Sequence, residues 1–234
     1  MNNQLQNTLT NHAHSAWQSN PAMHQIINGY AEFHAVLAIV GGLFLLITGT
    51  CSIKGWARFK RVDKIDRFKW PFSKKVYFCF ASLFTVIALL LALVTVANIT
   101  NVTNPLPGFT DSIPSMTTDS YNQQLYVAFN DWIVSGNSTP PSLVQQRIHH
   151  RRVFHTIRVI GGVVLLVLFT MLSLWIWKRL IQKREASETK WTLKDVTMLA
   201  SGVIVVAIAL FMMVVVMANL QSAVVPIANT LQFG

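Results

Sequence analysis

Four long apolar stretches limit what this chain can fold into more than any other feature of its sequence. They cover about residues 35–53, 76–97, 157–177 and 197–218, and none contains an ionisable side chain away from its ends. A helix of roughly 20 residues crosses a hydrocarbon core of about 30 Å. Because a backbone in lipid must satisfy its own hydrogen bonds, each stretch predicts a transmembrane helix. We therefore expect an all-α integral membrane protein with a four-helix bundle.

The composition agrees with this fold class. Of the 234 residues, 52% are hydrophobic and only 12% are charged. These proportions exclude an ordinary soluble domain, since the apolar residues also occur in long runs.

The chain also repeats itself at a constant spacing of 121 residues. Residues 23–105 align without a gap with residues 144–226, and 19 of the 83 aligned pairs are identical. The identities include polar and aromatic residues, which chance similarity between two apolar segments would not reproduce: Phe33-His34 with Phe154-His155, Gly41 with Gly162, Trp56 with Trp177, Asn98 with Asn219, and Pro105 with Pro226.

This repetition predicts a tandem duplication of a two-span unit, with residues 1–115 as the first repeat and residues 116–234 as the second. Each unit crosses the membrane twice, so both copies have the same orientation. We therefore expect a pseudo-two-fold axis along the membrane normal.

Basic residues predict the orientation in the membrane. Segment 54–75 carries nine Lys and Arg residues and segment 178–196 carries six, whereas residues 1–53 carry none. Because Lys and Arg in short loops stay on the cytoplasmic side, we expect both basic loops in the cytoplasm and both termini outside a plasma membrane. The net charge of +10 then reflects topology and contact with membrane lipids, and it does not indicate a nucleic-acid partner.

A long external connection, residues 98–156, joins the second and third spans. Residues 99–118 are rich in Asn, Thr, Ser and Pro and predict an irregular loop. Residues 119–135 place Leu125, Phe129 and Trp132 at helical spacing, which predicts an amphipathic helix in an external cap, with residues 2–17 as its counterpart. Prolines predict where two membrane helices start, at Asn20-Pro21 and at Thr139-Pro140-Pro141.

All seven histidines fall on the predicted external side or at its membrane boundary. They are His12, His14, His24, His34, His149, His150 and His155. His34 and His155 are repeat-equivalent, and each shares a helical face with a glycine seven residues further on, Gly41 and Gly162.

Two interpretations of His34 and His155 follow. They are either paired ligands or hydrogen-bonded residues at the starts of two helices. As ligands they would bind a haem between them, or hold a transition metal completed by His149, His150 or Glu32. Gly41 and Gly162 would provide close packing or clearance for that cofactor.

Four arginines lie on the predicted external side, where basic residues are disfavoured. They are Arg147, Arg151, Arg152 and Arg158. Such a group predicts contact with anionic lipid headgroups or with an acidic surface of a partner.

No catalytic residue is predicted. The sequence contains no Gly-rich phosphate loop, no His-Glu-x-x-His, no Gly-x-Ser-x-Gly and no Cys-x-x-Cys. Away from their ends the spans contain no Asp, Glu, Lys or Arg, which disfavours an ion-coupled carrier.

The leading interpretation is a non-enzymatic accessory or scaffold component of a larger membrane assembly, whose partner is another membrane protein or a second copy. The alternatives are a bis-histidine haem or metal-binding redox protein, and a small permeation or ligand-transport protein.

Overall fold

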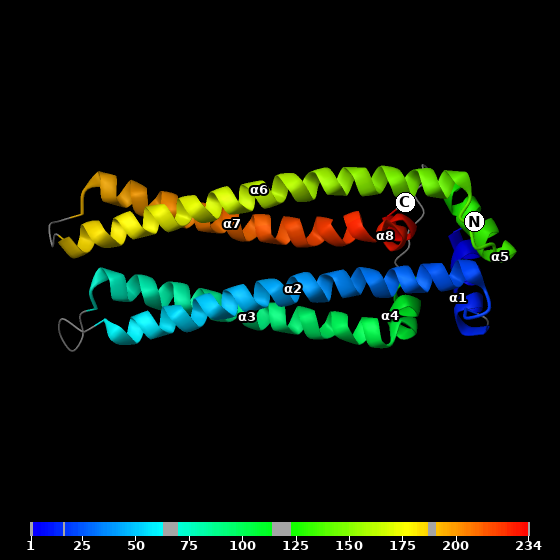
Figure 1. Ribbon diagram of the computed structural model, residues 1–234, viewed down its shortest axis with the longest axis horizontal. Helices are drawn as coiled ribbons and strands as arrows, with labels where there is room; N and C mark the ends of the chain where they lie inside the picture. Colours follow the sequence, from blue (N-terminus) through cyan, green and yellow to red (C-terminus); the bar gives the residue numbers. More distant parts are fainter. Residues whose placement is uncertain (1, 16, 63–69, 114–122, 187–190, 234) are drawn as a thin grey trace. The chain divides into compact units, whose positions relative to one another are not determined.

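The computed structural model describes residues 2–15, 17–62, 70–113, 123–186 and 191–233. These residues form eight α-helices and no strand (Figure 1), which confirms the all-helical class. The helices are α1 (Asn2–Ser15), α2 (Pro21–Arg61), α3 (Phe72–Thr103), α4 (Pro105–Ser112), α5 (Gln123–Ser135), α6 (Ser142–Ala186), α7 (Leu193–Val224) and α8 (Pro226–Phe233).

Four of these helices, α2, α3, α6 and α7, are long and apolar enough to cross a membrane. They contain the four predicted stretches, and each extends beyond its stretch. Helix α2 begins at Pro21 and α6 begins at Ser142, directly after Pro140-Pro141. Both predicted helix starts are therefore confirmed to within a residue or two, the usual uncertainty of a helix boundary.

The chain divides into two compact units. The first, here called the cap unit, comprises Met1–Ile39, Thr95–Val159 and Met217–Gly234, and the second, the span unit, comprises Val40–Val94 and Ile160–Val216. Each unit contains segments from both predicted repeats. The compact units therefore do not correspond to the division into residues 1–115 and 116–234.

The cap unit has a hydrophobic core of its own. Its largest fully buried side chains include Trp132 and Phe129 from α5 and Ile26 and Ile27 from α2. The predicted apolar stripe of α5 is buried in this core, and α5 packs against α1. This confirms the amphipathic helix within residues 119–135 and shows that its apolar face is covered by protein.

The irregular loop predicted for residues 99–118 is wrong for the part that the structure describes. Helix α3 continues to Thr103, and α4 follows at once from Pro105 to Ser112. A proline fits the first turn of a helix, because N–H groups there form no hydrogen bond within the helix and the missing N–H of proline costs none. Phe109 of α4 is 2% exposed, so burial of this ring in the cap core outweighs the poor helix propensity of its neighbours. Residues 114–118 lie outside the described residues.

In the span unit, α2 packs against α3 and α6 packs against α7. If Gly55 of α2 carried a Cβ atom, that atom would lie 3.1 Å from the Cβ atom of Ala81 on α3. One placed on Gly162 of α6 would lie 3.1 Å from a methyl group of Val216 on α7. Small residues thus allow close approach within each helix pair. The pairs meet where the Phe80 ring contacts the Trp177 ring, with centroids 4.9 Å apart.

Candidate functional site in the cap unit

Both repeat-equivalent histidines bind an asparagine on the neighbouring membrane helix. The Nδ1 atom of His34 lies 2.6 Å from Oδ1 of Asn98, and Nδ1 of His155 lies 2.9 Å from Oδ1 of Asn219. In each case the partners are 64 residues apart. The two bonds therefore occupy equivalent positions in the two repeats.

These contacts favour one tautomer of each ring. An amide oxygen only accepts, so Nδ1 donates its hydrogen to the asparagine, and Nδ2 of Asn101 lies further from Nδ1 of His34, at 3.5 Å. In the neutral imidazole Nε2 then holds the lone pair, which is the form in which histidine binds a metal while its other nitrogen is held by a second group. No described residue forms a hydrogen bond with Nε2 of His34 or His155.

The surroundings explain why each asparagine needs this bond. Asn98 and Asn219 are 7% and 9% exposed, and a buried amide without a partner costs free energy. His34 also contacts the Tyr30 ring, with centroids 4.4 Å apart. The bond between His34 and Asn98 therefore links α2 to α3, and the bond between His155 and Asn219 links α6 to α7, both within the cap unit.

Sequence reasoning missed this pairing although its signal was present. Asn98 and Asn219 are identical at the repeat spacing, as are His34 and His155. The equal separation of 64 residues in the two copies could have suggested one His–Asn contact in each. The interpretation of the two histidines as hydrogen-bonded residues at helix starts named no partner for them.

The structure does not assemble the predicted metal ligands into one cluster. Among the described residues, no three His, Cys, Asp or Glu side chains gather closely enough to hold a metal ion. Gly41 is buried and Gly162 packs on Val216 of α7, so Gly162 serves packing within its own helix pair. A ligand shared by His34 and His155 stays a prediction.

The four external arginines have different surroundings. The Arg158 guanidinium lies 3.9 Å from the centroid of the Phe154 ring, where a cation–π contact holds it. Arg147 and Arg151 are half-buried, whereas Arg152 is exposed and lines a pocket.

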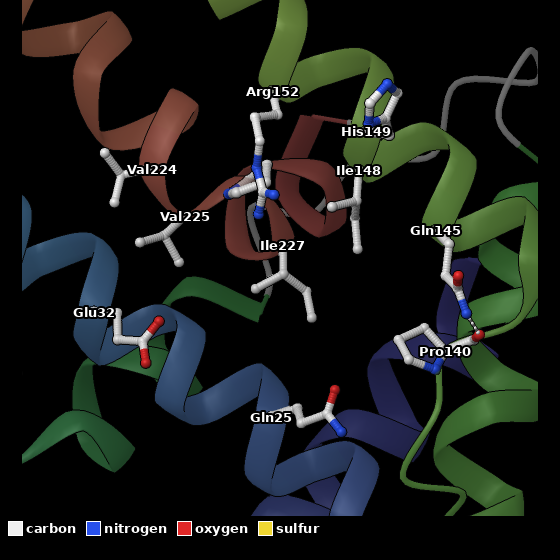
Figure 2. Close-up of a pocket in the computed structure, with 11 residues that line it drawn as sticks. Gln25, Glu32, Pro140, Gln145, Ile148, His149, Arg152, Val224, Val225 and Ile227 are labelled. Atoms are coloured by element: carbon white, nitrogen blue, oxygen red, sulfur yellow. Dashed lines mark hydrogen bonds between the residues drawn. The ribbon is translucent and has the colours of Figure 1, made fainter. Parts of the chain in front are cut away.

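This pocket is lined by three of the side chains that the sequence analysis singled out. Figure 2 shows Glu32 on α2, Arg152 and His149 on α6, and the junction of α7 and α8 around this pocket, with the Arg152 side chain directed toward that junction. The cavity has a volume of about 380 Å³ and is open to its surroundings. His150, the other histidine considered as a ligand, is exposed and does not line it.

No protein-family model, curated protein or solved structure matches this chain. The function is therefore inferred from the residues and their geometry.

Proposed function

We propose that this protein is a non-enzymatic component of a larger membrane assembly, in which its spans pack laterally against a helix of another membrane protein or of a second copy. One observation carries the proposal. Gly42 and Gly49 of α2 have no atom within 4 Å of the place where a side chain would begin. The chain itself therefore makes no use of the space that these two glycines leave.

The other glycines of the spans are of two kinds: Gly161 of α6 is open in the same way as Gly42 and Gly49, and the others are not. Gly55 and Gly162 face close neighbours within the chain, which explains their lack of a side chain. A glycine in a helix interior costs about 1 kcal/mol relative to alanine, so Gly42 and Gly49 need another explanation. Close approach of a helix from outside the chain provides one.

The positions of these residues on α2 form a continuous strip. Gly42 and Gly49 are seven residues apart, so they differ by only about 20° around the helix. Ala38, four residues before Gly42, extends the strip toward the cap end. Large apolar side chains stand beside it, since Ile39 and Leu46 are 64% and 69% exposed. A strip of small residues flanked by bulky ones is a common surface for helix association in membranes.

Burial within the spans is consistent with association. In the most apolar part of each membrane helix, only 11–17% of the residues are buried inside the chain. Lipid can cover the remaining apolar side chains, but lipid tails gain nothing specific from a glycine strip. A helix of a partner gains backbone contacts there.

The assembly is tested by enlarging the glycines. Gly42→Leu and Gly49→Leu fill the strip, whereas Ala207→Leu adds nearly as many carbon atoms at an exposed position of α7. We expect the first two variants to lose most of the partner protein, or the dimeric mass, that the wild type retains when extracted in mild detergent from its native membrane. If they keep the same complexes as Ala207→Leu, the proposal is wrong.

We also infer that the chain arose by tandem duplication and that its halves are related by a pseudo-two-fold axis. Equivalent contacts support this. The contact of Gly55 with Ala81 corresponds, 121 residues on, to that of Ile176 with Gly202. The hydrogen bond from Lys74 to the carbonyl oxygen of Val62 corresponds to the ion pair of Lys183 with Asp195.

For orientation, we propose that both basic loops lie in the cytoplasm and both termini lie outside the plasma membrane. Single cysteines test this in a chain lacking Cys51 and Cys79. Ala186→Cys should resist a membrane-impermeant thiol reagent in intact cells, and Ser135→Cys should react with it. The reverse pattern would refute the orientation.

A second candidate function is a bis-histidine redox or metal-binding protein. The observation that favours it is the Nδ1–H form of both rings, which leaves Nε2 of His34 and His155 able to coordinate. An absorption spectrum and a metal analysis of the purified protein test it. A haem band or a stoichiometric metal that His34→Ala and His155→Ala each remove would establish this function, and their absence from the wild-type protein would rule it out.

A further inference from the structure

The pocket of the cap unit contains opposite charges on facing walls. Glu32 stands on α2 and Arg152 stands on α6, and both line the cavity (Figure 2). Among the described residues neither side chain forms an ion pair. Glu32 is also the only acidic residue before Asp63. The cavity therefore offers one anionic and one cationic group that the chain does not pair with each other.

Two amides add hydrogen-bond acceptors to the same cavity. The Gln145 side chain donates to the carbonyl oxygen of Pro140 at 2.7 Å, and the Gln25 side chain donates to the carbonyl oxygen of Ser138. Both glutamines line the cavity. Because their NH2 groups are engaged by backbone, their Oε1 atoms are left as acceptors. The lining therefore contains amide acceptors as well as the Glu32 carboxylate.

The remaining wall of the cavity is apolar. It consists of Ile148 on α6 and residues 224–227, where α7 ends and α8 begins. Gly29 of α2 makes this wall possible, since a side chain there would overlap the Ile227 methyl group, 2.3 Å from the position of its first carbon. This wall suits the hydrocarbon part of an amphiphile.

The cavity also stands close to the predicted membrane boundary. Glu32 precedes the apolar stretch that begins near residue 35, and Arg152 precedes the one that begins near residue 157. Lipid headgroups lie at this depth. A ligand that carries both charges would reach the two side chains from the lipid surface.

We propose that this pocket binds a phosphoethanolamine zwitterion. The phosphate would accept charge-assisted hydrogen bonds from the Arg152 guanidinium, which matches its geometry. The primary ammonium would donate to the Glu32 carboxylate, which lines the same cavity. In a phosphatidylethanolamine the glycerol and upper acyl carbons would lie on the wall formed by Ile148 and Ile227. The proposal depends on the spans lying in a membrane and is independent of the assembly role.

Competing headgroups test the proposal on the full chain in detergent micelles by native mass spectrometry. Phosphatidylethanolamine should bind with one-to-one stoichiometry. Phosphatidylcholine keeps the phosphate but cannot donate from its trimethylated nitrogen, and phosphatidylglycerol has no cation, so both should bind at least roughly tenfold more weakly, the factor expected when a charged hydrogen bond is lost. Equal binding of all three lipids would overturn the proposal.

Variants locate the site. Glu32→Gln and Arg152→Gln should each lower phosphatidylethanolamine binding by roughly tenfold or more. Asp131→Asn on α5 and Arg179→Gln on α6 remove the same charges outside the pocket and should leave binding unchanged. Circular dichroism confirms that each variant is folded. Unchanged binding in Glu32→Gln and Arg152→Gln, or equal loss in the control variants, would overturn the proposal.

Soluble phosphoethanolamine separates the two sources of this headgroup. If it binds saturably, loses binding in Glu32→Gln and Arg152→Gln, and displaces the lipid, the pocket recognises the free zwitterion. If the lipid binds with the expected variant pattern and soluble phosphoethanolamine does not displace it, the apolar wall is required and the ligand is the lipid. Failure of both to bind would refute the proposal.

Discussion

The contact between Gly55 and Ala81 provides the sharpest test of how the spans pack. In Gly55→Ala, the new Cβ atom would lie 3.1 Å from Cβ of Ala81, 3.3 Å from its Cα and 3.5 Å from its backbone nitrogen. Two of these three atoms belong to the α3 backbone, which cannot rotate away as a side chain does. Helix α2 must therefore shift relative to α3. Gly42→Ala makes the same chemical change on the same helix and meets no atom.

The difference between the two variants isolates the steric cost. Both replacements gain about 1 kcal/mol of helix propensity, and this gain cancels in the comparison. Overpacking a tight contact typically costs about 1–3 kcal/mol. We therefore expect Gly55→Ala to be less stable than Gly42→Ala by about 1–3 kcal/mol. Relative to wild type, Gly42→Ala should be unchanged or slightly more stable.

Equilibrium unfolding of the purified chain by sodium dodecyl sulfate in mixed micelles, followed by far-ultraviolet circular dichroism, measures this difference. The equivalent position in the second repeat suggests a compensating variant, because Ile176 there faces Gly202. Adding Ala81→Gly to Gly55→Ala should recover most of the lost stability. If Gly55→Ala is as stable as Gly42→Ala, or if the double variant recovers nothing, the close α2–α3 contact is wrong.

Three further predictions concern single contacts. Asn98→Ala and Asn219→Ala should each destabilise the protein by about 1–3 kcal/mol, because each removes the asparagine that bonds to Nδ1 of a half-buried histidine. Double-mutant cycles with His34→Ala and His155→Ala measure the coupling energy of each pair. A coupling energy near zero would contradict the prediction. Val206 occupies the position equivalent to Thr85, to which Nε1 of Trp56 donates a hydrogen bond. The equivalent Nε1 of Trp177 is buried and has no partner among the described residues, so Val206→Thr should stabilise the protein by about 1 kcal/mol. An unchanged unfolding midpoint would contradict this. Trp132→Ala removes a side chain that is 1% exposed and its hydrogen bond to the Asn137 carbonyl oxygen, and should cost about 3–5 kcal/mol. Limited proteolysis should then cleave α1 and α5, whereas Val134→Ala at a 62% exposed position should behave as wild type.

Much of the fold could be predicted because lipid imposes simple rules. A stretch such as 197–218 has no alternative to a helix, since no other segment conformation satisfies its backbone in hydrocarbon. The start of α2 at Pro21 and the apolar stripe of α5 followed from equally local signals, proline geometry and helical spacing. Helix α4 was missed because its short sequence has little helix propensity, and Phe109 is held by burial in a core that sequence order does not reveal.

The candidate site could be predicted only in part. The equivalence of His34 and His155 was evident in the sequence, but their partners were not, because a hydrogen bond between α2 and α3 depends on how the two helices are rotated and paired. The same holds for the pocket. Glu32 and Arg152 are 120 residues apart along the chain, and each on its own is an ordinary charged residue near a membrane boundary.

The sequence by itself determined that the four apolar stretches are helical and long enough to cross a membrane, and where equivalent positions recur. These properties depend on single segments and on their transfer between water and lipid. Only the tertiary structure decided that Asn98 and Asn219 hold the two histidines, that Gly42 and Gly49 face open space while Gly55 does not, and that Glu32 and Arg152 share a cavity. These facts depend on the packing of side chains from distant segments, which the order of residues along the chain does not specify locally.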